Sequence, residues 1–206
     1  MKTYTLFNSD SHAIPLADRS VDMVFTSPPF KDGDISGDYF VSYSTWMREI
    51  MRVTKKVAIV INSSTKLKFV LDHWTPDRVL IWGKGVNLCS YRWSPIFVYG
   101  IEPYLVNKYI WCDAFGVAAI HKKWKVHKYQ DPVILYKTVI GMFKGCKTVL
   151  DPFMGSATTG EACLRLGLTF IGIDIDPVAY KTAQDRLSAL SFQHEAFDPQ
   201  HKDQTP

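Results

Sequence analysis

Short apolar runs separated by polar turns recur along the chain and predict an alternation of strands and helices. Residues 57–61, VAIVI, are apolar throughout, which is typical of a strand buried on both faces of a parallel sheet. Further strands are predicted at residues 3–9, 21–25, 78–82 and 95–100, the last a candidate for antiparallel pairing. Apolar positions at helical spacing predict a helix at 44–52. Asp131-Pro132 offers an N-cap followed by proline at the first helical position, which predicts a helix that runs to about Phe143.

The clearest unit is residues 148–177, TVLDPFMGSATTGEACLRLGLTFIGIDIDP. An apolar run enters a glycine-containing turn, a helix follows to the C-cap candidate Gly167, and a second apolar run ends at Asp174. Asp176-Pro177 then starts a last helix. The apolar stripe of that helix is Ala179, Ala183, Leu187 and Leu190. The pattern predicts half of a Rossmann-like unit.

The chemistry of this unit favours a nucleoside-type ligand. Gly155 lets a ligand approach the backbone, and the N–H groups at the helix start face a carboxylate or phosphate. Asp174, at the tip of the second strand, can accept both hydroxyls of a ribose. The turn lacks a full G-x-G-x-x-G and a phosphate-gripping lysine, which disfavours a triphosphate. A glycine-containing turn that binds no ligand stays open on these residues alone.

A second candidate is the turn Ser27-Pro28-Pro29-Phe30, which directly follows the predicted strand 21–25. Two consecutive prolines forbid continuation of the strand and fix the backbone in an extended shape. Taken by itself, the turn is compatible with a rigid loop that carries an aromatic plug.

Composition narrows the class of protein. With 206 residues, 47% apolar and 21% charged, the chain predicts one globular domain. No apolar run approaches the ~18 residues of a membrane span, and the N-terminus lacks a hydrophobic signal region, which predicts a cytoplasmic protein without a membrane partner. Four scattered cysteines disfavour zinc and disulfides, and no metal is expected. A net charge of +4 does not by itself indicate nucleic acid.

Both candidate motifs resemble those of one family. DPFMGSATT, residues 151–159, is similar to the DPF-x-GSGTT cofactor motif of amino-methylating DNA methyltransferases, and S-P-P-F is similar to their catalytic [D/N/S]-P-P-[Y/F/W] turn. Ile81-Trp82-Gly83-Lys84 resembles the family's W-x-K segment, and residues 127–132 resemble its H-P-x-Q-K-P helix start. Ala157 replaces a glycine of the pattern, and Asp131 replaces a lysine. The resemblance covers most of residues 4–190.

The order of the motifs points to the permuted β class of these enzymes, because S-P-P-F precedes the cofactor motif by about 120 residues. The resemblance implies an α/β Rossmann-like methyltransferase fold with circularly permuted motif order. Its mostly parallel, seven-stranded sheet would carry helices on both faces. We expect one domain over residues 1–190 and a polar, flexible tail over 191–206.

The resemblance also assigns roles to residues. The Ser27 oxygen and the Pro28 carbonyl would accept the N–H bonds of an exocyclic amine, while Pro29 stiffens the turn and Phe30 stacks on the flipped base. S-adenosylmethionine would lie with its adenine near Asp10, its ribose at Asp174 and its methionine end at the 151–159 loop. The residues expected to bind it are Asp10, Asp151, Pro152, Phe153, Gly155, Ser156, Thr158, Thr159, Asp174, Ile175, His127 and Gln130.

DNA is the expected partner, and residues 101–127 form a short candidate target-recognition segment. The lysines of the basic cluster at its end could contact DNA phosphates, and its tryptophan could stack on a base. The alternative is a solvated basic loop. The residues of this cluster are Lys122, Lys123, Trp124, Lys125 and Lys128.

Several functions stay open at this point. Because S-P-P-[Y/F] resembles the cytosine-modifying subgroup of the family, the resemblance favours cytosine N4 over adenine N6 as the methylated atom of a site-specific DNA enzyme of the restriction-modification type. Carbon-5 methylation is disfavoured because the required Pro-Cys pair is absent. The alternatives are an RNA adenine-N6 methyltransferase and a non-catalytic, methyltransferase-like subunit that binds nucleic acid. A homodimer is also left open.

Overall fold

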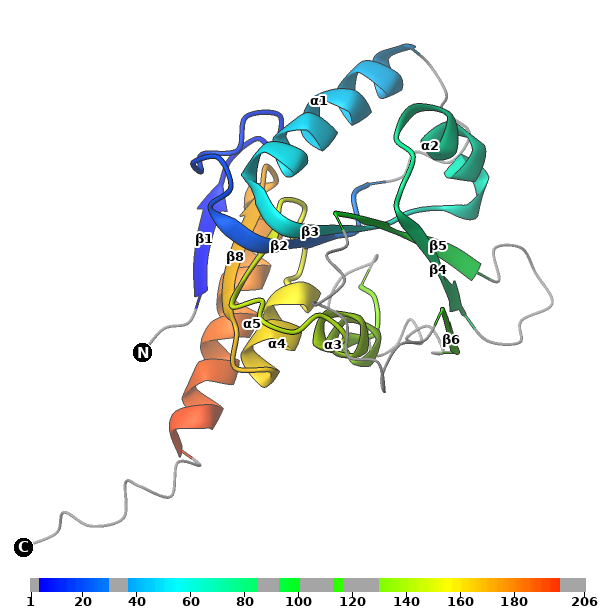
Figure 1. Ribbon diagram of the computed structural model, residues 1–206. Helices are drawn as coiled ribbons and strands as arrows, with labels where there is room; N and C mark the ends of the chain where they lie inside the picture. Colours follow the sequence, from blue (N-terminus) through cyan, green and yellow to red (C-terminus); the bar gives the residue numbers. More distant parts are fainter. Residues whose placement is uncertain (1–3, 30–36, 85–92, 101–112, 117–129, 197–206) are drawn as a thin grey trace, which may run out of the picture.

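The computed structural model describes residues 4–29, 37–84, 93–100, 113–116 and 130–196. They form one mixed sheet covered by helices on both faces (Figure 1). The strands are β1 (Tyr4–Asn8), β2 (Val21–Thr26), β3 (Thr54–Ile61), β4 (Arg78–Gly83), β5 (Trp93–Tyr99), β6 (Ala114–Gly116), β7 (Thr148–Asp151) and β8 (Thr169–Asp174). The helices are α1 (Gly37–Val53), α2 (Leu67–His73), α3 (Val133–Gly141), α4 (Thr158–Arg165) and α5 (Pro177–Ala196), with a 3-10 turn at Ser64–Lys66.

The strand order is β1-β8-β7-β2-β3-β5-β4-β6. Only β5 among these strands runs against its neighbours, as the sequence suggested for residues 95–100. The predicted α/β, mostly parallel fold is confirmed, but the described residues contribute eight strands to the sheet instead of the expected seven. The extra strand, β6, has three residues and pairs with β4 through Ile81 and Ala114.

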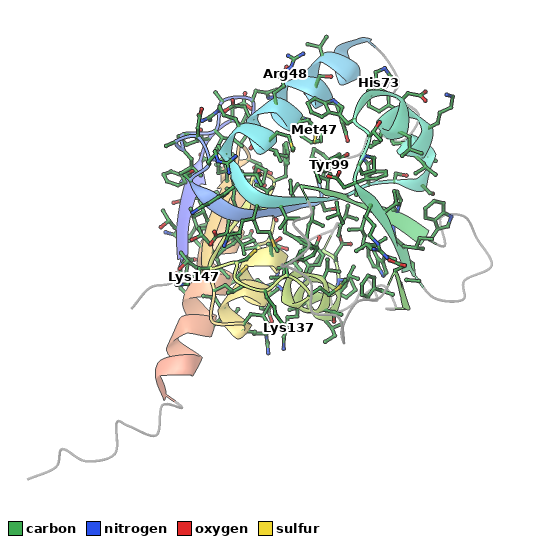
Figure 2. All side chains as sticks on the ribbon, in the orientation of Figure 1. Met47, Arg48, His73, Tyr99, Lys137 and Lys147 are labelled. Atoms are coloured by element: carbon green, nitrogen blue, oxygen red, sulfur yellow. The ribbon has the colours of Figure 1, made fainter. Side chains whose placement is uncertain are left out.

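Two apolar layers fix the helices to the sheet. On one face, α1 and α2 bury side chains such as Tyr43, Met47 and Val70 against the strands. On the other face, α3, α4 and α5 pack Leu135, Cys163 and Leu187 around the centre of the sheet. Figure 2 shows Met47 between α1 and the sheet, and Lys137 and Lys147 on the side of α3 to α5.

The C-terminal unit matches the sequence prediction closely. Gly167 ends α4 in a left-handed conformation with φ of 70°, and its N–H donates to the Leu164 carbonyl. Helix α5 continues to Ala196, six residues past the expected end of the domain at 190. No helix among the described residues is long and apolar enough to cross a membrane.

The strand order explains how distant motifs meet. Strands β7 and β8 lie between β1 and β2, so Met23 pairs with Val149 and Val24 with Leu150. Because parallel strands end at the same edge of a sheet, the turns after β1, β2, β7 and β8 lie together. This edge carries the candidate site.

Candidate active site

Asp151, at the end of β7, joins the two candidate motifs. Its Oδ1 accepts a hydrogen bond of 2.7 Å from the Thr26 hydroxyl, and Thr26 directly precedes Ser27. Its Oδ2 accepts a bond from the Thr159 hydroxyl, and the Phe153 N–H donates to Oδ1 at 3.0 Å. One carboxylate therefore fastens the end of β2 to the turn and helix that follow β7.

Burial changes the acidity of this carboxylate. Asp151 is only 3% exposed, and loss of hydration raises its pKa to about 6. The hydrogen bonds from Thr159, Thr26 and Phe153 oppose that rise, whereas the nearby charge of Asp174 adds to it. At neutral pH the site therefore holds a buried negative charge that a cationic ligand would stabilise.

The turn after β7 adopts a conformation that leaves room above Gly155. Gly155 has φ of 49°, and a Cβ at this position would meet nothing within 4 Å. The Gly155 N–H donates to Asp174 Oδ2 at 2.8 Å, and the Met154 N–H donates to the Ile173 carbonyl at 3.0 Å. The glycine thus supplies both a left-handed turn and an open backbone face.

Ala157, the departure from the family's glycine, sits at the N-cap of α4 with φ of 59°. A left-handed alanine costs about 1–2 kcal/mol. Its methyl group is fully buried in the core, and this burial stabilises the fold by roughly 0.8 kcal/mol. Burial therefore offsets much of the strain, and the turn keeps its shape without the second glycine.

Asp174 ends β8 beside this turn. Its Oδ1 accepts the Asp176 N–H at 2.9 Å, and the Asn8 side chain donates to its carbonyl at 2.8 Å. The next residue, Ile175, is 67% exposed. An acid followed by an exposed apolar side chain offers acceptors for ribose hydroxyls and a surface for an adenine ring.

Asp10 lies after β1 at the same edge. Its Oδ1 accepts the His12 N–H at 2.9 Å and lies 2.7 Å from His12 Nδ1, while His12 Nε2 lies 2.7 Å from Ser42 Oγ. The backbone bond from His12, followed by its side-chain bond, lowers the pKa of Asp10. The carboxylate is thereby fixed in its charged form on a loop tied to α1.

The catalytic candidates follow β2. Ser27 is half-buried, Pro28 is buried and Pro29 is exposed. On the same side as Ser27, the ring of Tyr136 on α3 packs against Phe25 with centroids 4.7 Å apart. The Tyr136 hydroxyl donates to Asp131 Oδ2 at 2.9 Å, so a partly buried polar pair lies at the start of α3.

Comparison with known proteins finds DNA methyltransferases that are similar to this chain. Residues 107–185 match the model of the N6_N4_Mtase family, described as DNA methylase. The chain is 41% identical over 70 residues to the type II methyltransferase M2.DpnII of Streptococcus pneumoniae. That alignment covers 33% of the chain and 26% of the relative. M.HinfI of Haemophilus influenzae, another type II methyltransferase, is 25% identical over 234 residues, which cover 85% of the chain and 65% of the relative.

Over these matched segments the chain is similar to DNA methyltransferases of the N6_N4_Mtase type. It spans less than two thirds of the length of these two relatives. Two solved structures share its fold at low identity. The M1.HpyAVI–SAM complex has a TM-score of 0.63 at 19% identity, covering 89% of this chain and 99% of that one. The cytosine-N4-specific PvuII DNA methyltransferase has a TM-score of 0.66 at 14% identity, covering 95% of each chain.

Most residues that the resemblance to these methyltransferases assigned to the site lie at the edge just described. They are Asp10, Ser27, Pro28, Pro29, Asp151, Pro152, Phe153, Gly155, Ser156, Thr158, Thr159, Asp174 and Ile175. Gln130 is buried directly before Asp131. Phe30, His127 and the basic cluster Lys122, Lys123, Trp124, Lys125 and Lys128 lie outside the described residues.

Several of these side chains are engaged within the protein. Thr159 bonds to Asp151, the Pro152 carbonyl accepts the Ser11 hydroxyl, and the Phe153 ring contacts Trp46 edge-on with centroids 5.4 Å apart. Asp131 also differs from expectation. Pro132 is the N-cap of α3, and the Asp131 carboxylate accepts the Tyr136 hydroxyl instead of capping the helix.

Sequence reasoning did not single out Thr26, Tyr136 or Arg186. The position of Thr26 directly before S-P-P-F was a usable signal. Tyr136 and Arg186 looked like ordinary helix residues, because their partners lie on other elements. Arg186 of α5 donates to the Ser156 carbonyl at 2.7 Å and to Glu161 Oε2 at 2.5 Å, and so holds the turn after β7.

Replacing Arg186 with methionine is expected to cost about 1–3 kcal/mol of unfolding free energy, because the Ser156 carbonyl and one Glu161 oxygen lose their donor. Glu161 keeps its bond from Arg165, which limits the loss. Urea unfolding measures the change. The control is Lys181→Met, which removes an exposed pair with Asp185 and should cost less than about 1 kcal/mol. Equal costs for the two variants would contradict the special role of Arg186.

Proposed function

We propose that this chain transfers a methyl group from S-adenosylmethionine to the exocyclic amino group of a base extruded from DNA. The single observation that supports it most is the Asp151 carboxylate, which joins the S-P-P turn to the cofactor-type turn. The cofactor, when bound, supplies an electrophilic methyl group on a sulfonium ion.

The residues present fit this cofactor. Asp174 offers acceptors for the ribose hydroxyls, and Ile175 offers an exposed apolar side chain for the adenine. The open face above Gly155 admits a ligand close to the backbone, and the buried negative charge of Asp151 suits a cation. Asp10 adds a second fixed carboxylate on the neighbouring loop.

Ser27 and the Pro28 carbonyl perform the chain's part of the chemistry in this proposal. The lone pair of an aniline-like amine is delocalised into its ring, which makes the nitrogen a poor nucleophile. Two acceptors on its N–H bonds draw the nitrogen toward tetrahedral geometry and stabilise the positive charge that develops on it. The prolines hold the carbonyl in place, and Phe30 would stack on the base.

Cytosine N4 is the preferred target in this proposal because serine, rather than aspartate, begins the turn. The buried Ala157 occupies the left-handed N-cap position of α4, which supports a cofactor-binding turn over a non-catalytic subunit. To test the function, the protein is incubated with radiolabelled S-adenosylmethionine and either duplex DNA or RNA, and digested products are identified by mass spectrometry. N4-methylcytosine in DNA is expected. Label in RNA alone, or no label and no calorimetric heat with the cofactor, would overturn the proposal.

Replacing Asp174 with alanine is expected to weaken cofactor binding by roughly 1–3 kcal/mol, because the ribose hydroxyls lose their acceptor. The variant also releases the Gly155 N–H, which adds to the effect. Titration calorimetry measures the affinity. Asp185→Ala on α5, an exposed carboxylate paired only with Lys181 among the described contacts, is the control and should bind normally. An unchanged affinity in Asp174→Ala would remove this residue from the cofactor site.

Replacing Lys122, Lys123 and Lys125 with alanine should flatten the salt dependence of DNA binding. The log–log slope is expected to fall by about 0.9 on duplex DNA for each phosphate that the variant no longer neutralises. The control is the triple replacement of Lys55, Lys144 and Lys147, exposed lysines at or just before the first residues of β3 and β7, whereas the candidate site lies where the strands end. Identical slopes for the two triple variants would contradict phosphate contacts by these lysines and would support the alternative of a solvated basic loop.

A further inference from the structure

Tyr136 lies where its hydroxyl faces the catalytic turn. The side chain is 3% exposed, and its ring is tilted 53° to that of Phe25. Ser27 directly follows the last residue of β2, and its side chain lies within hydrogen-bonding reach of the Tyr136 hydroxyl. A tyrosine whose ring covers Phe25 therefore carries its hydroxyl toward Ser27.

The hydrogen bond to Asp131 settles the direction of the Tyr136 hydroxyl. Its single proton is donated to Asp131 Oδ2 at 2.9 Å, which leaves the oxygen lone pairs to accept from a neighbour. Burial, and then the charges of Asp131 and Asp151, raise the pKa of Tyr136 far above its usual value, while the Ser27 hydroxyl acts in the opposite direction. The phenol thus stays protonated near neutral pH, with the Ser27 hydroxyl as its neighbour.

We infer that Tyr136 is a positioning residue for Ser27: its phenol, anchored on Asp131, accepts the Ser27 proton and turns the Ser27 lone pairs toward the amino group of the base. The inference rests on the proposed function and adds a residue to it. Asp131 has a matching role here, since a lysine at this position, as in the family pattern, could not accept the tyrosine proton.

The orientation matters because a serine hydroxyl can either donate or accept. If Ser27 donated its proton to the amine nitrogen, it would occupy the lone pair that must attack the methyl group. If Ser27 accepts an N–H, it strengthens the same nitrogen as a nucleophile. Fixing the hydroxyl through Tyr136 selects the second arrangement before the base arrives.

Tyr136→Phe tests the inference with little change in packing, because the ring on Phe25 is kept. Single-turnover methyl transfer to DNA is expected to fall roughly tenfold to hundredfold, by analogy with the loss of a residue that orients a metal ligand. Cofactor affinity should not change. The matched control is Tyr4→Phe, which removes a tyrosine bond of 3.0 Å to Ser188 away from the site and should methylate at the unmutated rate.

Two further comparisons separate positioning from general destabilisation. Tyr136→Phe should add no slowing in a Ser27→Ala background, because the hydroxyl that it orients is then absent. Asp131→Asn keeps an acceptor oxygen and should stay within a fewfold of the unmutated rate, whereas Asp131→Leu should behave like Tyr136→Phe. A multiplicative loss in the double variant, or full activity of Tyr136→Phe, would overturn the inference.

Urea unfolding of the unmutated protein, the two single variants and the double variant provides a reading that needs no substrate. If the two hydroxyls interact, the shifts in midpoint caused by Ser27→Ala and Tyr136→Phe should not add in the double variant. Additive shifts would contradict the contact. Failure of the unmutated protein to methylate any nucleic acid, with coupled midpoints, would instead count against the proposed function alone.

Discussion

Replacing Ser27 with alanine is expected to lower methyl transfer about a hundredfold or more while cofactor affinity stays nearly intact. The reason is that the Ser27 oxygen acts on charge that appears only in the transition state, so its removal raises the barrier without weakening ground-state binding of the cofactor. Removing one oriented hydrogen-bonding group from an oxyanion hole costs about a hundredfold to a thousandfold, and an acceptor at a developing cation should act comparably.

Single-turnover methylation of duplex DNA measures this effect, with cofactor binding followed separately by calorimetry. Ser188→Ala is the matched control, because it removes a half-buried serine hydroxyl that bonds to Tyr4 far along the chain from the turn. Phe30→Ala should instead weaken capture of the extruded base, and Phe30→Tyr should be tolerated because the ring is kept. Unmutated rates in both Ser27→Ala and Phe30→Ala would show that the active site lies elsewhere.

The stability of the protein is expected to depend on the ionisation of Asp151. Its pKa of about 6 in the folded protein lies above the ordinary 3.8, so the folded state holds the proton more tightly than the unfolded chain does. The resulting stabilisation is fully present below pH 3.8 and is lost as the pH rises through about 6. The total change is about 3 kcal/mol.

Asp151→Asn removes this titration while keeping an acceptor oxygen for Thr26 or Thr159. Urea unfolding between about pH 4 and about pH 7.5 should therefore show the stability difference between the unmutated protein and Asp151→Asn shifting by about 2.4 kcal/mol in favour of the variant at high pH. Other groups titrate equally in both proteins, so the difference isolates Asp151. Parallel stability curves would mean that the carboxylate ionises as readily in the fold as in water.

The same ionisation should appear in cofactor binding. A cationic ligand favours the charged carboxylate, so the affinity of the unmutated protein for S-adenosylmethionine should increase as the pH rises through about 6. Asp151→Asn should bind with little dependence on pH in this range.

Much of the fold could be predicted from the sequence, because its strands are short apolar runs and its C-terminal unit has clear residue signals for its turn, its helix end and its strand end. Residues 148–177 combine a glycine turn, a helix stop at Gly167 and an acid at a strand tip, and each feature has a local physical cause. Strand β6 was not predicted, because it has only three residues and only Phe115 among them is buried. So short a segment shows no recognisable alternation of apolar and polar positions.

The internal bonds of the site could not be predicted in the same way. Asp151 looked like a ligand-binding acid, yet its carboxylate bonds to Thr26, which is 125 residues away in the chain. Tyr136 looked like a core residue of a helix, and Phe25 becomes its neighbour only when α3 packs on β2. Such contacts depend on the tertiary arrangement, which local patterns do not encode.

The insertion of β8 and β7 between β1 and β2 has a consequence for biosynthesis. While the chain emerges from the ribosome, β1 and β2 are made first but cannot complete their pairing until residues 148–174 follow. The nascent protein therefore carries unpaired strand edges for most of its translation, which favours association with other chains or recognition by chaperones. Because contacts so distant in sequence close late, the sheet edge that carries Ser27 should be among the last parts to mature.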